Sequence, residues 1–221
     1  MPDWLAHLWY DANFCASMTA MTLGFSLRTE GMHHVPAAGP AILISNHQSV
    51  LDPILVGLAA RRHLYFMSKQ PLFDYPAFAW FIRTLNAIPV NQAGIGIEGL
   101  RLLMKKLKAG NAIMVFPEGE RTFTGNVGPL KPGIHLLIKK TPAPIVPIGI
   151  AGAFHAWPRW RSWPILAPLF VPANQSTLAV SIGQPLAPGR YVKLTRKRAL
   201  SELCDHLRMM QHKAEALRRK P

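Results

Sequence analysis

From residue 41 onward, short apolar runs alternate with longer stretches of helical periodicity, and this alternation restricts the fold more than any other feature. It is typical of α/β domains, in which helices cover a central sheet. Strands are predicted at residues 41–45, 64–68, 87–90, 112–116, 145–150 and 178–182. Helices are predicted at residues 53–62, 76–85, 97–108, 133–140 and 195–219. We therefore expect an α/β fold with a mixed central sheet flanked by helices.

Residues 1–27 precede this pattern and are rich in aromatic residues and methionine. They suit one or two amphipathic helices, which could lie in a membrane interface or pack on the core. The uncharged stretch 12–27 is interrupted by Asn, Ser and Thr and is shorter than the ~20 apolar residues of a membrane span. No secretory signal is evident. We expect residues 1–27 to be a membrane-associating helical segment of a protein that is monotopic at most, and residues 28–221 to be a single domain that includes the last helix.

The charge balance indicates an anionic partner. The 221 residues include 25 Lys and Arg against 11 Asp and Glu, a net charge of +14, although 49% of the chain is apolar. Phosphate-bearing lipid and nucleic acid both fit this excess. One face of helix 195–219 is basic, which fits either a solvated face or attraction to anionic lipid. The loop 153–174 combines three Trp with Arg159 and Arg161, as expected of an interfacial insertion, a packed surface loop or a nucleic-acid platform.

The cysteine and histidine pattern gives little sign of a metal site. Cys15 and Cys204 lie far apart and belong to no ligand cluster, which favours a reducing cytosol. The adjacent His33 and His34 have no third ligand at a suitable spacing. We therefore expect no metal.

A histidine and an aspartate follow the first predicted strand, in the run Asn46-His47-Gln48-Ser49-Val50-Leu51-Asp52. Five residues turn through about 140° on a regular helix, so the two side chains meet only if the chain turns between them. The strand end and the helix start at Pro53 allow that turn. His47 is then a candidate general base that Asp52 orients. Asp52 before Pro53 is equally an ordinary helix N-cap, and both roles are compatible.

A second motif, Phe116-Pro117-Glu118-Gly119-Glu120-Arg121, lies directly beyond the predicted strand 112–116. Ligand sites of α/β sheets usually lie at such strand ends. Arg121 can bind a phosphate through two parallel hydrogen bonds, and Gly119 lets a ligand approach the backbone closely.

Together the two motifs resemble the PlsC-like glycerolipid acyltransferase family. The resemblance covers residues from about 28 to 186 and includes Gly31, Lys69, Lys131, Gly133 and the run Val146-Pro147-Ile148-Gly149-Ile150. It implies transfer of an acyl group from acyl-CoA or acyl carrier protein to the hydroxyl of a lysophospholipid, most directly lysophosphatidic acid, without a cofactor. His47 would be the base and Asp52 its partner. The residues expected to bind substrate are Asn46, Lys69, Asn91, Glu118, Gly119, Arg121 and Lys131.

Two positions depart from the family pattern. Asn91 stands where a phosphate-binding Arg is usual, so one charge-assisted contact is missing unless Lys131 or Arg101 supplies it. Glu120 adds a negative charge near the same site, or is simply solvated. The acceptor therefore stays open between lysophosphatidic acid held differently and another lysolipid.

Other interpretations explain less of the sequence. Gly94, Gly96 and Gly99 match G-x-G-x-x-G, but the distal acids belong to the arginine motif, so we expect a mobile loop that opens helix 97–108 rather than a dinucleotide site. A nucleic-acid-binding protein would leave both motifs unexplained. The expected partners are the anionic cytosolic face of the cell membrane, a lysophospholipid and the acyl donor, and no nucleic acid is expected.

Overall fold

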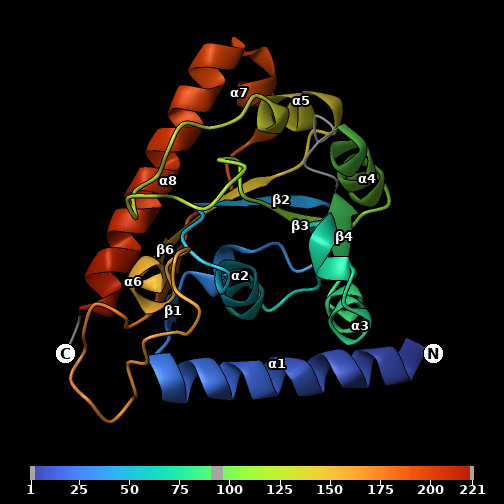
Figure 1. Ribbon diagram of the computed structural model, residues 1–221. Helices are drawn as coiled ribbons and strands as arrows, with labels where there is room; N and C mark the ends of the chain where they lie inside the picture. The colour runs from blue at the N-terminus through green and yellow to red at the C-terminus, as the bar shows by residue number, and fades with distance from the viewer. Residues whose placement is uncertain (1–2, 91–96, 220–221) are drawn as a thin grey trace.

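The structure, a computed structural model, describes residues 3–90 and 97–219. It confirms the expected α/β fold: a seven-stranded sheet lies between helices (Figure 1). The strands are β1 (Arg28–Glu30), β2 (Ala41–Ser45), β3 (Leu64–Lys69), β4 (Ala87–Val90), β5 (Ala112–Val115), β6 (Ile145–Ala151) and β7 (Ala179–Ile182). Their order is β1-β7-β6-β2-β5-β3-β4, and among these neighbours only β6 and β7 are antiparallel. The sheet is therefore mixed, as expected.

The predicted elements agree with the structure to within two residues at each end. The helices are α1 (Asp3–Phe25), α2 (Asp52–Ala60), α3 (Pro76–Thr84), α4 (Ile97–Lys108), α5 (Gly133–Lys140), α6 (Ala153–Ala156), α7 (Pro188–Lys193) and α8 (Arg196–Arg218), with 3-10 turns η1 (Met32–His34) and η2 (Gln70–Phe73). The sequence did not predict β1, α6, α7 or the two 3-10 turns. They are three to six residues long, too short to show a hydrophobic period.

Both faces of the sheet are buried, and β2 shows why. Its five residues are all buried. Leu43 packs with Leu55 of α2 on one face, whereas Ile42 and Ile44 pack on the other face with side chains of α4, α5 and α8. Successive side chains of a strand point to opposite faces, so the unbroken apolar run Ala41–Ile44 supplies both cores.

The N-terminal segment forms one helix, α1, of 23 residues, which lies as an outer layer beneath α2 and α3 (Figure 1). Met21 and Phe25 at its end pack on the core, and Trp9 Nε1 donates a hydrogen bond to Thr84 Oγ1 at 3.2 Å. Leu8 and Leu23 of the same helix are exposed. No helix in residues 3–90 or 97–219 combines the length and the hydropathy needed to cross a membrane. A role in membrane association and a division of the chain at residue 27 stay predictions.

Asn91 and the first two glycines of the glycine motif, Gly94 and Gly96, lie outside the described residues. Gly99 is described and lies in the first turn of α4, where an added Cβ would be 2.2 Å from Val90 Cγ1. The expected loop role is therefore wrong for Gly99, which lets α4 pack closely on β4.

Gly149 of β6 likewise permits close packing, in this case of α8. The buried stripe of α8 includes Leu203, Leu207 and Met210. A Cβ on Gly149 would be 2.0 Å from the carbonyl carbon of Met210 and 2.2 Å from the amide nitrogen of Gln211. The helix backbone thus lies directly on the strand, and only glycine fits.

Gly149→Ala is expected to lower the free energy of unfolding by about 3 kcal/mol, because the methyl group must displace α8 from the sheet. Gly57→Ala is the matched control, since a Cβ there meets nothing within 4 Å and alanine favours the helix by ~0.5–1 kcal/mol. Urea denaturation of both variants measures the difference. An unchanged midpoint for Gly149→Ala would contradict this packing.

Candidate active site

The predicted meeting of His47 and Asp52 is present in the structure. The chain leaves β2, turns, and enters α2 at Asp52, so that His47 Nδ1 lies 2.7 Å from Asp52 Oδ2. The same oxygen accepts hydrogen bonds from the amides of Gln48 and Ser49, the latter at 2.7 Å. Asp52 is fully buried. The carboxylate thus closes the turn and binds the imidazole at once.

The N-cap interpretation of Asp52 is wrong. Leu51 occupies the cap position of α2, and no side chain caps the helix. Asp52 accepts from the amides before the helix rather than from those inside it, because the turn brings Gln48 and Ser49 over its carboxylate. Its role is to build the turn that carries the histidine.

The imidazole of His47 is held so that its Nε2 atom can act as a base. A carboxylate faces Nδ1, so in the neutral imidazole this contact favours the proton on Nδ1 and a lone pair on Nε2. The ring stacks on Phe116 at a centroid distance of 4.2 Å, and 19% of the side chain is exposed. The main chain is fixed on both sides: the His47 amide donates to Glu118 Oε1 at 2.9 Å, and the Thr122 amide donates to the His47 carbonyl at 2.7 Å. A hydroxyl group can therefore reach a base of fixed orientation.

Glu118 is a buried residue of the second motif that is bonded to His47 of the first motif. Its second oxygen accepts from the Gly128 amide at 2.8 Å, and the side chain is only 6% exposed. Burial raises the pKa of Glu118, while the hydrogen bonds from Gly128 and His47 partly oppose that rise. Both carboxylate oxygens are occupied by backbone amides, so the structure gives Glu118 a positioning role. Its predicted contact with the acceptor stays a prediction.

The other predicted substrate-binding residues are placed differently. Asn46 is buried and pairs with Ile150 of β6, through Nδ2 to the carbonyl at 3.0 Å and through Oδ1 to the amide at 2.8 Å. Gly119 has φ +79°, and an added Cβ would lie 3.1 Å from Lys131 Cε, so the Lys131 side chain covers this glycine. Lys69 is exposed at the end of β3. Contacts of these residues with substrate stay predictions.

Arg121 lies half-buried beside the histidine turn. Burial lowers the pKa of Arg121, as does the nearby charge of Arg159, whereas the charge of Asp52 raises it. No hydrogen-bond partner of its guanidinium is present among the described residues. The structure thus brings His47, Asp52, Glu118, Gly119 and Arg121 together, with a cation ready for an anion near the base.

Two residues of the site escaped sequence reasoning. Gln48 is buried, donates to the Gly125 carbonyl at 2.8 Å and accepts from the Phe154 amide at 3.2 Å. Its position directly after His47 is the one feature of the sequence that could have indicated a role for Gln48 in the site. Arg159 donates to the Arg121 carbonyl at 3.2 Å across 38 residues, for which the local sequence carries no signal.

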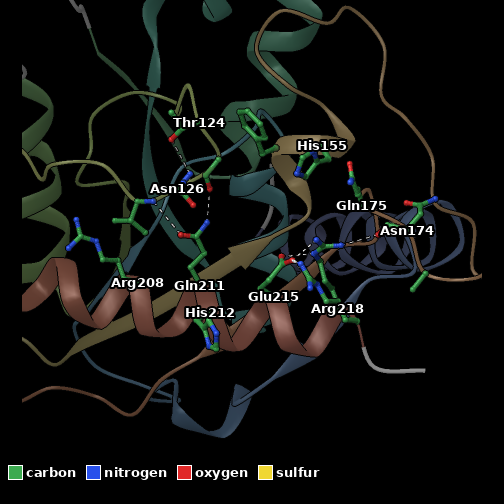
Figure 2. Close-up of a pocket in the computed structure, with 15 residues that line it drawn as sticks. Thr124, Asn126, His155, Asn174, Gln175, Arg208, Gln211, His212, Glu215 and Arg218 are labelled. Carbon is green, nitrogen blue, oxygen red and sulfur yellow. Dashed lines mark hydrogen bonds and ion pairs between the residues drawn. The ribbon is translucent and has the colours of Figure 1, made fainter.

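A separate cleft of about 880 Å³ lies against α8, and residues of the segments 124–127 and 173–175 also form its walls (Figure 2). Its walls include Asn126, His155, Arg208 and Gln211, and His47 does not line it. The Gly125 carbonyl connects the two regions, because it accepts hydrogen bonds from Gln48 and from Gln211 of α8, the latter at 2.6 Å. Glu215 forms ion pairs with Arg218 and Arg219 within the cleft. These ion pairs neutralise part of the positive charge of the cleft.

Known proteins resemble this chain in sequence and in structure. Residues 26–151 match the model of the acyltransferase family. A chloroplastic 1-acyl-sn-glycerol-3-phosphate acyltransferase of Brassica napus is 32% identical over 126 residues, which cover 56% of this chain and 36% of that protein. A Bacillus subtilis enzyme of the same name is 23% identical over 197 residues, which cover 88% of this chain and 92% of the Bacillus enzyme. The chain therefore spans about a third of the plant relative but nearly the whole bacterial one.

Among solved structures, the 1-acyl-sn-glycerophosphate (LPA) acyltransferase PlsC of Thermotoga maritima superimposes with a TM-score of 0.73 at 27% identity. The superposition covers 93% of this chain and 78% of that one.

Glu118→Ala is expected to lower the free energy of unfolding by about 2 kcal/mol, because it leaves the His47 and Gly128 amides without acceptors. Denaturation measures the loss. Glu120→Gln is the control: this neighbouring carboxylate is 55% exposed, and its replacement should change stability by no more than ~0.5 kcal/mol. Equal stability of the two variants would show that Glu118 does not hold the turn.

Proposed function

The chain belongs to the acyltransferase family, and from this premise we propose that it transfers a fatty acyl group from a thioester donor to the free hydroxyl of a lysophospholipid, with lysophosphatidic acid as the expected acceptor. The observation that carries this proposal is that a partly exposed His47, bonded to the buried Asp52, lies near Arg121, whose guanidinium has no hydrogen-bond partner among the described residues. The base supplies the chemistry and the cation recognises phosphate. The names of the relatives support the choice of acceptor.

In the proposed reaction, His47 Nε2 removes the proton of the acceptor hydroxyl as its oxygen attacks the thioester carbonyl. Asp52 stabilises the imidazolium that forms, because its charge faces Nδ1 at 2.7 Å. Collapse of the tetrahedral intermediate breaks the C–S bond, and the leaving thiolate takes the proton back from His47. The new ester and a free thiol are the products, so neither a cofactor nor a covalent acyl-enzyme is needed. The donor is acyl-CoA or acyl carrier protein.

We also propose peripheral docking on the cytosolic face of the cell membrane. The loop after α6 exposes Trp160, Trp163 and Phe170, with 66%, 79% and 88% of each residue accessible. The loop is bonded to the end of α1, since the amides of Ala167 and Leu169 donate to the carbonyls of Gly24 and Leu23. Figure 1 shows the two side by side. Aromatic side chains of this kind favour the membrane interface, so α1 and this loop together offer one apolar surface to lipid.

His47→Ala is expected to lower kcat/KM by about 10²- to 10⁴-fold, because no other group takes the hydroxyl proton. Transfer of a radiolabelled acyl chain from acyl-CoA to lysophosphatidic acid measures it. His212→Ala, at an exposed histidine of α8, should retain full activity. Unimpaired turnover in a folded His47→Ala protein would refute the base assignment.

The double variant Trp163→Asp, Phe170→Asp is expected to bind vesicles of phosphatidylcholine and phosphatidylglycerol at least about tenfold more weakly, because two large apolar side chains are lost from the interface. Co-sedimentation with the vesicles gives the bound fraction. Met209→Asp changes an apolar side chain on α8 that is 47% exposed and should bind like the unaltered protein. Equal binding of all three proteins would exclude the loop from the docking surface.

A further inference from the structure

The guanidinium of Arg159 lies at the arginine motif although it belongs to the loop after α6. Its Nη1 atom donates to the Arg121 carbonyl at 3.2 Å, and its Cζ atom lies 3.8 Å from the centroid of the Phe123 ring. Stacking on Phe123 and the bond to the carbonyl fix the direction of the group. The bond to the Arg121 carbonyl uses only Nη1, and 29% of the side chain is exposed, so other N–H donors can bind a ligand.

Arg159 therefore lies beside the backbone of Arg121, and among the described residues neither guanidinium has a strong anionic partner. Burial lowers the pKa of Arg121, and the nearby charge of Arg159 lowers it further, as expected for two cations close to each other. The nearest carboxylate to Arg159 is Glu120, at 3.7 Å, and it is 55% exposed. An ion pair that long and that solvated contributes little. An incoming anion would relieve the repulsion, so the pair is arranged for a ligand of high negative charge.

The backbone links this pair of cations to the base. The Thr122 amide donates to the His47 carbonyl at 2.7 Å, immediately after Arg121. On the other side, Ser49 Oγ donates to the Trp157 carbonyl at 2.8 Å, which attaches the Arg159 loop to the turn that carries His47. Hydrogen bonds thus connect the segments that carry the two arginines to the turn that carries His47.

We infer that Arg159 is the second cation of the acceptor site and that it binds, together with Arg121, the phosphate monoester of the lysolipid. This inference rests on the proposed function and deepens it. A phosphate monoester carries up to two charges and three terminal oxygens, so it can accept forked hydrogen bonds from two guanidinium groups. A lysolipid with a phosphodiester head group offers fewer free oxygens and one charge. The pair therefore selects lysophosphatidic acid, and the charge that the sequence lacks at Asn91 comes from a distant loop.

Arg159→Gln tests the inference in detergent micelles, where membrane docking does not limit the rate. With lysophosphatidic acid as acceptor, KM should rise about 10- to 100-fold, as expected for the loss of one charge-assisted contact. With 1-monoacylglycerol, which has no phosphate, the rate should stay within about twofold. Arg159→Lys keeps the charge and should lose less than the Gln variant. Arg161→Gln, from the same loop but with an exposed side chain, is the matched control. It should change neither the KM for lysophosphatidic acid nor the rate with 1-monoacylglycerol.

A binding measurement separates the inference from the proposed function. Glycerol 3-phosphate is the probe, and broadening of its ³¹P signal by the full chain reports binding without turnover. Broadening that Arg159→Gln abolishes and Arg161→Gln preserves supports the phosphate site, even if the protein were to acylate no lysolipid and the proposed function failed. Equal KM values and equal broadening in Arg159→Gln would overturn the inference. An equal loss with both acceptors would also overturn it, because it would show a structural role.

Discussion

One buried carboxylate organises the whole site. Asp52 Oδ2 accepts hydrogen bonds from the His47 ring and from two amides of the turn that precedes α2. Burying a carboxylate is costly, and three donors on one oxygen offset part of that cost. The same bonds leave the imidazole one orientation. A structural requirement, closing a tight turn between a strand and a helix, and a chemical one, orienting a base, are therefore met by one atom.

The sheet explains why the rest of the site lies beside this turn. β2 pairs in parallel with β5 on one side and with β6 on the other, so the segments that leave these three strands meet at one edge. Three buried polar side chains then join the segments: Asn46 binds Ile150, Gln48 binds Gly125 and Phe154, and Glu118 binds His47 and Gly128. Each is satisfied by backbone groups, which makes the assembly rigid. Rigid support of this kind is what a positioned base requires.

The loop after α6 contributes both to the candidate active site and to the exposed apolar surface. The loop exposes Trp and Phe residues and is bonded to the end of α1, while Arg159 in the same loop contacts the arginine motif. An acceptor of the proposed type has an apolar chain and a charged head group. The loop offers groups for both, within a few residues of each other.

The sequence by itself determined the secondary structure of the main elements and the chemical identity of the site. Apolar runs such as Ala41–Ser45 and the stripe of α8 fix strands and helices, because their periods match one type of element. The two motifs named His47, Asp52 and Arg121, and the second motif follows a predicted strand, where ligand sites of α/β sheets usually lie. The tertiary structure decided which polar residues bind inward and which face outward. Asn46 and Glu118 bind backbone groups of neighbouring segments, which the sequence did not indicate, and Arg159 bonds to the carbonyl of Arg121, a contact that none of the interpretations of its loop included. The physical reason is distance along the chain: contacts across 38 to 104 residues depend on strand order and loop path, and no local pattern of residues encodes those.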